Sequence, residues 1–262
     1  MDPINDEIGV PEAARVKRGV ALVTGASRGV GPRIAQGLAD VGWAVAVNYA
    51  HDDAGATRTV VGIRDRGGVA DRFKFDVTDA TSVVEGVASI AATIGPVDMI
   101  VNNATGPQGA VPIADQDWVL YSRHLDFFVK APLVLLQAVL TDWRHRKTGR
   151  IINIGSSVID AGSARDAHYV AAKSAMLGLT RSWASELGPE GITVNMVSPG
   201  WTPVERHVGT LEVQLERYTS QVPLRRMGVP NDLAGMVAFI ASPSADFITG
   251  QNFRVNGGRH YG

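Results

Sequence analysis

Short apolar runs alternate with longer segments of helical length from Gly19 onward. The runs are rich in β-branched residues and apolar on both faces, as strands are in a parallel sheet that helices cover on both sides. Strand and helix alternating in this way predict an α/β fold built on a doubly wound parallel sheet. The seven predicted strands are Val20–Thr24, Trp43–Asn48, Val69–Asp76, Asp98–Asn102, Arg150–Ile154, Ile192–Val197 and Asn252–Val255.

Composition excludes several classes of function. The 262 residues are 45% apolar and 19% charged, which is ample for a buried core. The 25 basic residues nearly balance the 26 acidic ones, so we expect no nucleic-acid partner. The chain has no cysteine, which excludes disulfides, thiolate zinc sites and a cysteine nucleophile. Its 6 histidines are scattered and lack zinc-site spacing, so we expect no metal.

The chain is expected to form one domain, residues 18–262, after a loose lead-in. Residues 1–17 are acidic and broken by prolines, unlike the basic start and apolar run of a secretory signal. The best membrane candidate, Ala131–Leu140, contains Gln137 and is far shorter than the ~20 apolar residues that a membrane helix needs. We therefore predict a cytoplasmic protein with no membrane partner.

A glycine-rich turn follows the first predicted strand directly and precedes a helical pattern that starts at Pro32. Such a turn aims backbone N–H groups and the positive end of the helix dipole at a pyrophosphate, and glycine lets the ligand approach closely. The alternative is a tight turn in some other α/β protein. The residues predicted to contact a dinucleotide here are Gly25, Ser27, Arg28, Gly29, Val30 and Gly31.

Four later motifs, together with the glycine spacing Gly-x-x-x-Gly-x-Gly, carry a family resemblance. The motifs are Asp76-Val77 and Asn102-Asn103-Ala104 at the ends of the third and fourth strands, Tyr169-x-x-x-Lys173 in a helical stretch, and Pro199-Gly200 after the sixth strand. Over about residues 18–258 the chain resembles the short-chain dehydrogenase/reductase family, in particular bacterial 3-oxoacyl-(acyl-carrier-protein) reductases.

This resemblance implies a single-domain Rossmann fold with a seven-stranded sheet. It also implies a homotetramer formed through the helices around residues 115–145 and 167–188 and through the carboxyl-terminal segment. The further cofactor contacts that the resemblance implies are Asp76, Val77, Asn103, Ala104, Tyr169, Lys173, Pro199, Gly200 and Thr202.

The end of the second strand predicts the type of nicotinamide cofactor. An NAD site usually has an acidic residue there, but this strand ends in Val47-Asn48-Tyr49. Arg28 in the glycine turn could pair with a 2′-phosphate. We therefore predict NADPH/NADP+, with Asn48 and Tyr49 in the cofactor site. Asp52 and Asp53 follow shortly after, so NADH remains the weaker alternative.

Tyr169, Lys173 and Ser156 are the predicted catalytic residues. Lys173 comes four residues after Tyr169, which places both on nearly the same helix face. A neighbouring ammonium stabilises a phenolate, as proton transfer by tyrosine near neutral pH requires. Ser156 follows the fifth strand, where its hydroxyl could hold a substrate oxygen. A lone Tyr–Lys pair of this spacing is more often a surface feature of a helix.

One residue departs from the family pattern. Phe128 aligns with an asparagine that, by resemblance, helps to hold a water molecule relaying protons to the lysine. A phenyl ring cannot hydrogen-bond there, so slower proton resupply is our hypothesis. His124, one helical turn away, could substitute for the asparagine, although a surface or interface histidine is the simpler expectation.

Residues 201–222 are the predicted substrate lid, with Trp201 and Val204 as substrate contacts. An apolar stripe at helical spacing in this segment is more often simple packing. The nearby basic residues Arg206, Arg217, Arg225 and Arg226 could attract an anionic acyl carrier, but we expect most of them to face solvent.

The sequence thus predicts an NADPH-dependent carbonyl reductase whose substrate is a small carbonyl compound, with a 3-oxoacyl thioester as one candidate. Two alternatives stay open. One is an NAD(P)-dependent alcohol or polyol dehydrogenase. The other is a cofactor-binding sensor or scaffold with weakened catalysis, which only Phe128 favours.

Overall fold

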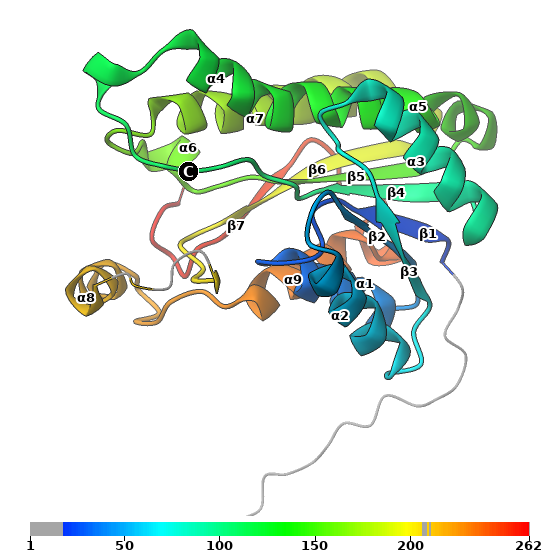
Figure 1. Ribbon diagram of the computed structural model, residues 1–262, viewed down its shortest axis with the longest axis horizontal. Helices are drawn as coiled ribbons and strands as arrows, with labels where there is room; N and C mark the ends of the chain where they lie inside the picture. The colour runs from blue at the N-terminus through cyan, green and yellow to red at the C-terminus, as the bar shows by residue number, and fades with distance from the viewer. Residues whose placement is uncertain (1–17, 206–208, 210, 262) are drawn as a thin grey trace, which may run out of the picture.

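The computed structural model describes residues 18–205, 209 and 211–261, so the predicted lead-in lies outside the described residues. Its centre is one seven-stranded parallel sheet in the order β3-β2-β1-β4-β5-β6-β7, which confirms the predicted Rossmann fold (Figure 1). The strands are β1 Val20–Val23, β2 Ala44–Tyr49, β3 Ala70–Lys74, β4 Val97–Asn102, β5 Gly149–Ile154, β6 Ile192–Pro199 and β7 Asn252–Val255. The predicted strands match these within a few residues.

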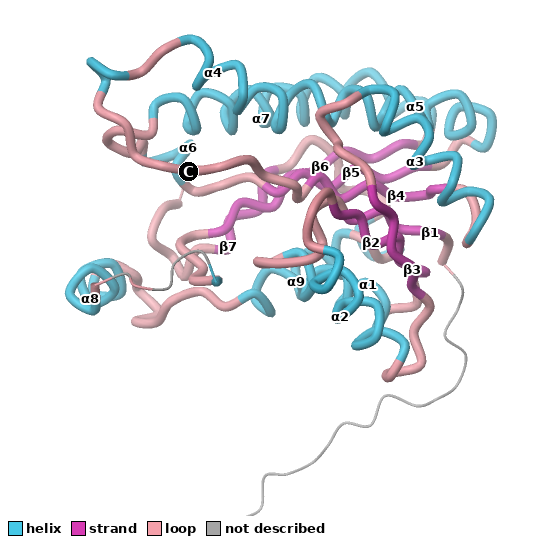
Figure 2. Tube along the Cα trace, in the orientation of Figure 1, coloured by secondary structure: helices cyan, strands magenta, loops and turns pink. Residues whose placement is uncertain are grey.

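Helices form a layer on each side of the sheet (Figure 2). The helices are α1 Gly31–Asp40, α2 Asp53–Arg64, α3 Ala80–Thr93, α4 Trp118–Leu125, α5 Ala131–Arg146, α6 Val158–Ala161, α7 Ala167–Leu187, α8 Glu212–Ser220 and α9 Pro230–Ile240. Short 3-10 turns span Ile113–Asp115, Gly188–Glu190 and Pro243–Ala245, and a π-helical turn, Asp126–Lys130, joins α4 to α5.

Two apolar clusters, one on each face of the sheet, form most of the core. On one face α1, α2 and α9 bury side chains such as Leu38 and Val237 against the strands. On the other face α3, α5 and α7 do the same with Leu135 and Leu187, among others. Because both faces are covered, the strands need apolar residues at successive positions, which is the pattern seen in the sequence.

Aspartates begin several of the helices. Asp52, Asp79 and Asp117 precede α2, α3 and α4, and each side chain accepts a hydrogen bond from a backbone N–H in the first turn. Such caps satisfy N–H groups that have no partner within the helix and typically contribute about 1 kcal/mol each.

The order of the strands determines where a ligand can bind. The chain builds outward from β1 through β2 to β3, then returns to the other side of β1 for β4 to β7. The connections on the two sides of this reversal diverge, and they leave a crevice at the carboxyl ends of the strands. The glycine turn after β1 and Ser156 after β5 therefore belong to the same edge of the sheet.

The stretch Trp118–Arg146 is helical throughout its 29 residues, with a mean hydropathy of 1.4 for its most apolar window. By length and composition alone it could cross a membrane, whereas the sequence indicated only the shorter Ala131–Leu140. In this fold, however, α5 packs on the sheet. Trp143 is fully buried and its Nε1 donates to Val97 O over 2.7 Å. Core packing therefore explains the apolar composition.

Candidate active site

Helix α7 places Tyr169 and Lys173 beside the carboxyl end of β5. Lys173 is buried, and its ammonium donates a hydrogen bond of 2.5 Å to the carbonyl oxygen of Ile154, the last residue of β5. Ser156 follows two residues later and is also buried, with its Oγ 3.4 Å from the amide nitrogen of Val158. The structure thus brings the predicted lysine and serine to one strand end, with Tyr169 one turn before the lysine.

A chain of buried amides holds α7 in register with the sheet. Asn102 Nδ2 donates to Asn153 Oδ1 over 2.8 Å, and Asn153 Nδ2 donates to Thr180 Oγ1 over 2.9 Å. All three side chains are buried, so a lost partner would leave an unsatisfied group that costs about 1–3 kcal/mol. We did not predict roles for Asn153 and Thr180. For Asn153, the available sequence signal was a polar residue inside an otherwise apolar strand.

The glycine turn is built so tightly that larger residues do not fit. Gly25 and Gly29 have φ values of +61° and +69°, in the region that favours glycine. A Cβ on Gly31 would lie 2.5 Å from Gly25 O and 2.8 Å from Asn103 Nδ2. Only glycine at these positions therefore allows the turn to bring the end of β1 and the start of α1 this close together.

Asn103 and Ala104 brace this turn from β4. Asn103 Nδ2 donates to Thr24 O over 2.8 Å and to Gly25 O over 3.1 Å. In return, Thr24 Oγ1 accepts from the backbone N–H groups of Asn103 and Ala104 at 2.9 and 3.0 Å. This arrangement gives the two residues a structural role in shaping the turn, while their contact with a cofactor stays a prediction.

Asn48, at the end of β2, supports the same turn. Its side chain is buried, accepts from the Gly25 N–H over 3.1 Å and donates to Phe75 O over 2.9 Å. The ring of Tyr49 is also buried. Both predicted cofactor residues thus lie beside the turn but have protein partners of their own, and a direct contact with a cofactor stays a prediction.

The acidic residues that follow β2 are also engaged. Asp52 caps α2, and Asp53 accepts hydrogen bonds from the Tyr49 hydroxyl and the Arg72 guanidinium. The bond from Tyr49, followed by that from Arg72, lowers the pKa of Asp53 below its ordinary value. Both carboxylates thus have protein partners, each through its Oδ1.

On its exposed side, the glycine turn binds the carboxylate of a distant side chain. The Gly29 N–H donates to the carboxylate of Glu205 over 3.1 Å, although the two residues are far apart in the chain. Ser27 and Val30 are half-buried in the same turn, and Arg28 is exposed. An N–H that accommodates a carboxylate oxygen here has the geometry that a phosphate oxygen requires.

Asp76 and Val77 follow β3 on the same edge of the sheet. Asp76 Oδ1 accepts from both the backbone N–H and the hydroxyl of Thr78 at 2.8 Å, whereas the side chain of Val77 is buried. Their proposed contact with an adenine ring stays a prediction.

Phe128 lies directly on the lysine. It is fully buried in the π-helical turn, and the Lys173 ammonium lies 3.8 Å from the centre of its ring. The ring of Tyr169 meets Phe128 edge-on at 5.6 Å between centroids. A phenyl face stabilises a cation through its quadrupole, by ~2 kcal/mol or more when water is excluded. The residue that departs from the family pattern thus contacts both Lys173 and Tyr169, the predicted catalytic pair.

The expectation that His124 is a surface or interface histidine is wrong for this chain. His124 is buried, and its Nδ1 lies 2.9 Å from Leu120 O. Its ring stands 4.6 Å from that of His168 and 6.1 Å from that of Tyr169. His124 lies on the face of α4 that packs against α7, and the local sequence does not reveal this packing. Among the described residues, His124 Nε2 and both ring nitrogens of His168 have no hydrogen-bond partner.

The buried His168 predicts an acid-sensitive fold. Burial, then the neighbouring His124, lowers its pKa from 6.5, while Asp166 opposes the shift. The unfolded chain therefore takes up a proton at a pH where the folded chain resists it. The stability that comes from keeping His168 neutral is complete above about pH 6.5 and is lost as the pH falls. When the pH is lowered from about 7.5 to about 5.5, we expect the thermal unfolding midpoint to fall less for His168→Asn than for the parent protein.

Thermal unfolding midpoints at the two pH values measure this effect. The control is His51→Asn, because His51 is exposed and should leave the pH dependence of the parent unchanged. An equal fall in the midpoint for His168→Asn and the parent would refute the assignment.

Hydrogen bonds join the segment after β6 both to the neighbour of the predicted catalytic serine and to α8. Pro199 O accepts from the Ser157 N–H over 2.9 Å, and the Gly200 N–H donates to Val255 O over 2.9 Å. The Trp201 N–H donates to the Tyr218 hydroxyl over 2.6 Å. Thr202 is buried, Val204 is half-buried, and the substrate and cofactor contacts predicted for this segment stay predictions.

Within the described residues, no group of three or more histidine, aspartate or glutamate side chains could hold a metal ion. Part of the predicted lid, residues 206–208 and 210, lies outside the described residues, and Arg206 with it.

Comparison with known proteins supplies independent support for the family. A family model described as enoyl-(acyl carrier protein) reductase matches residues 25–260. The 3-oxoacyl-(acyl-carrier-protein) reductase of Staphylococcus aureus is 37% identical over 242 residues, 92% of this chain and 97% of that protein.

Solved structures agree with this sequence relationship. A blue fluorescent protein from a metagenomic library, in complex with NADPH, has a TM-score of 0.85 and 36% identity, over 95% of this chain and 100% of that one. A gluconate 5-dehydrogenase from Burkholderia cenocepacia, in complex with NADP and tartrate, has a TM-score of 0.86 and 30% identity, over 94% and 96% of the two chains. With its glycine turn, braced Asn-Asn-Ala segment and Tyr–Lys helix, the chain belongs to the short-chain dehydrogenase/reductase family.

Proposed function

We propose that the protein is an NADPH-dependent carbonyl reductase that acts on a ketone, with Tyr169 as the proton donor. The observation that carries this proposal is the position of Tyr169 and Lys173 on α7, with the lysine ammonium bound at the end of β5 beside Ser156. The prediction of an NADP-dependent oxidoreductase agrees with relatives that were solved with NADPH and NADP.

The glycine turn fits a dinucleotide on grounds of space and charge. A Cβ at Gly31 would collide with the turn, and the Gly29 N–H already donates to a carboxylate oxygen. Gly25, Ser27, Gly29 and Val30 would surround the pyrophosphate at the start of α1. Arg28 is exposed beside them, where it could reach a 2′-phosphate.

The residues of the chain have distinct roles in the proposed reduction. When bound, NADPH supplies the hydride that reaches the carbonyl carbon. Tyr169 gives its hydroxyl proton to the carbonyl oxygen as negative charge develops there. Ser156 hydrogen-bonds the same oxygen and orients it. Lys173, held by Ile154 O and the face of Phe128, keeps a positive charge near the tyrosine.

Engagement of the acids after β2 supports NADPH over NADH. Asp52 caps α2, and Asp53 is bound by Tyr49 and Arg72, so both carboxylates have protein partners that compete with the hydroxyls of an adenosine ribose. Arg28 supplies the positive charge that favours an added phosphate.

The substrate class rests on relatives and stays a proposal. The Staphylococcus aureus relative is named for reduction of 3-oxoacyl groups on a carrier protein, which makes a 3-oxoacyl thioester the first candidate. The gluconate 5-dehydrogenase similarity favours a second candidate, NAD(P)-dependent oxidation of an alcohol or polyol. A sensor or scaffold without turnover is the remaining alternative, with Phe128 as its only support.

We also propose a cytoplasmic homotetramer without membrane or nucleic-acid partners. The exposed apolar side chains of Ile113, Trp118 and Val119 lie at or beside α4, within the region from which subunit contact is expected. Measuring the mass of the protein in solution tests this assembly.

The proposed function predicts turnover of a ketone at the expense of NADPH. A screen that follows NADPH and NADH oxidation should include β-ketoacyl thioesters, cyclic ketones, α-diketones and ketosugars. We expect at least one ketone to be reduced, with kcat/KM at least about tenfold higher for NADPH, equivalent to ~1.4 kcal/mol of preference. No turnover of any carbonyl compound would favour the sensor, and equal efficiency with NADH would contradict the cofactor preference.

A further inference from the structure

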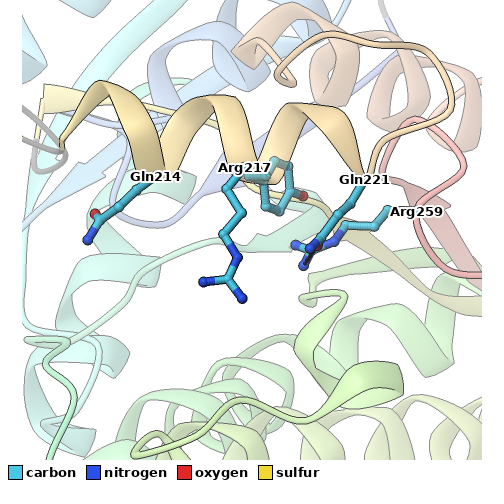
Figure 3. Close-up of a pocket in the computed structure, with 5 residues that line it drawn as sticks. Gln214, Arg217, Gln221 and Arg259 are labelled. Carbon is cyan, nitrogen blue, oxygen red and sulfur yellow. Dashed lines mark hydrogen bonds between the residues drawn. The ribbon is translucent and has the colours of Figure 1, made fainter.

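Helix α8 borders a polar cleft of about 270 Å³. We call it the α8 cleft; its lining residues are Gln214, Arg217, Tyr218, Gln221 and Arg259 (Figure 3). Three of these lie in α8, Gln221 directly follows the helix, and Arg259 comes from the segment after β7. Two guanidinium groups and two amides therefore face one small space, and none of its described lining residues is a carboxylate.

Arg259 is held in place before any ligand arrives. Its guanidinium carbon lies 4.1 Å from the centre of the Tyr218 ring, and its Nη2 donates to Gln221 Oε1 over 2.8 Å. Stacking on an aromatic ring leaves the other N–H groups of an arginine directed outward. Figure 3 shows the Arg217 side chain extending from α8 into the same space.

The two arginines have no acidic partner among the described residues, unlike two other arginines nearby. Arg226 is bound by Asp232, and Arg254 is bound by Asp160. Across the described part of the chain, no carboxylate lies within ion-pair distance of Arg217 or Arg259. Concentrated positive charge without a counter-ion in a lined cleft is the arrangement that recognises an anion.

Hydrogen bonds connect the α8 cleft to the proposed catalytic site. Tyr218 is buried behind Arg259, and its hydroxyl accepts from the Trp201 N–H over 2.6 Å. Two residues before Trp201, Pro199 O accepts from Ser157, the neighbour of Ser156. The cleft therefore lies on the element that continues from the carboxyl end of β6, on the substrate side of the sheet.

We propose that the α8 cleft binds an anionic group, a carboxylate or a phosphate, on a part of the substrate away from its carbonyl. This inference rests on the proposed carbonyl reductase and adds that the substrate is anionic. Arg259 supplies a fixed pair of N–H donors, Arg217 closes on the anion from α8, and Gln214 can donate from its amide. Arg217 is exposed, as are Arg225 and Arg226, in agreement with the expectation that most arginines of this segment face solvent.

Binding measurements on the NADP+-loaded protein test the proposal with two matched pairs of ketones. The first pair is 4-oxopentanoate and its methyl ester, which differ by a carboxylate. The second is acetoacetyl-coenzyme A and acetoacetyl-N-acetylcysteamine, of which only the first carries phosphates. We expect Arg217→Gln and Arg259→Gln each to weaken binding of one anionic ketone about tenfold, the effect of losing one charge-assisted hydrogen bond. Binding of its neutral partner should change less than about twofold.

Arg225→Gln is the matched control, because Arg225 is nearby, donates to Ser220 O and does not line the cleft. It should leave all dissociation constants unchanged. The pair that responds identifies the anion as carboxylate or phosphate. Failure of both anions to bind, or equal weakening for neutral and anionic ketones, would overturn the proposal. Turnover of the neutral ketones with NADPH by the parent protein reports separately on the proposed function.

Discussion

Replacing Tyr169 with phenylalanine is expected to lower kcat for ketone reduction by at least about a thousandfold, within the range for a lost proton donor. The hydroxyl is the only group that the substitution removes, and the ring can keep its edge-on contact with Phe128. Hydride cannot be transferred productively when the developing alkoxide has no proton donor. The dissociation constant for NADPH should stay within about twofold, because most of the binding surface lies along the glycine turn.

Stopped-flow or steady-state NADPH oxidation measures the rate, and fluorescence titration measures cofactor binding. Tyr121→Phe is the matched control, since it removes a hydroxyl on neighbouring α4 that donates to Gln116 Oε1. That variant should retain its rate. If Tyr169→Phe reduced ketones at the parental rate, the role of Tyr169 as proton donor would be wrong.

Replacing Phe128 with leucine is expected to lower kcat/KM by up to about thirtyfold. Leucine keeps the site apolar but removes the ring face that lies 3.8 Å from the Lys173 ammonium. A desolvated cation–π contact is worth ~2 kcal/mol, which corresponds to this factor. Because the ring stabilises the charge of the ammonium, its loss should also change the pH profile of the rate.

Phe127→Leu serves as the control, because it shortens the adjacent, half-buried phenylalanine. It should reduce the rate less than about threefold, and thermal unfolding should show that both variants are folded. A rate and pH profile unchanged in Phe128→Leu would remove the assigned contact from the mechanism.

A second substitution at this position tests proton supply. Phe128→Asn introduces an amide that can hold a water molecule near Lys173, so a faster rate or a changed pH profile is expected if resupply is slow in the parent. An unchanged rate and profile in Phe128→Asn would count against slow proton resupply. The two substitutions thus separate charge stabilisation from proton transfer.

The sequence alone predicted the sheet and the strand ends that carry the site. Apolar runs on both faces required a covered parallel sheet, and the glycine turn after the first run required a tight approach of backbone to ligand. The four-residue spacing of Tyr169 and Lys173 placed them on one helix face, because helical periodicity is a local property. These inferences depended on residues close in the chain, where geometry follows directly from sequence.

Only the tertiary structure decided which distant side chains meet. The buried links from Asn102 through Asn153 to Thr180, the ring of Phe128 on the lysine and the burial of His124 against α7 all join separate elements. Likewise, Arg217 and Arg259 are 42 positions apart by their numbers, and only the packing of α8 against the carboxyl-terminal segment brings them to one cleft. Periodicity determines the face of an element, but the identity of its neighbour depends on how the whole chain packs.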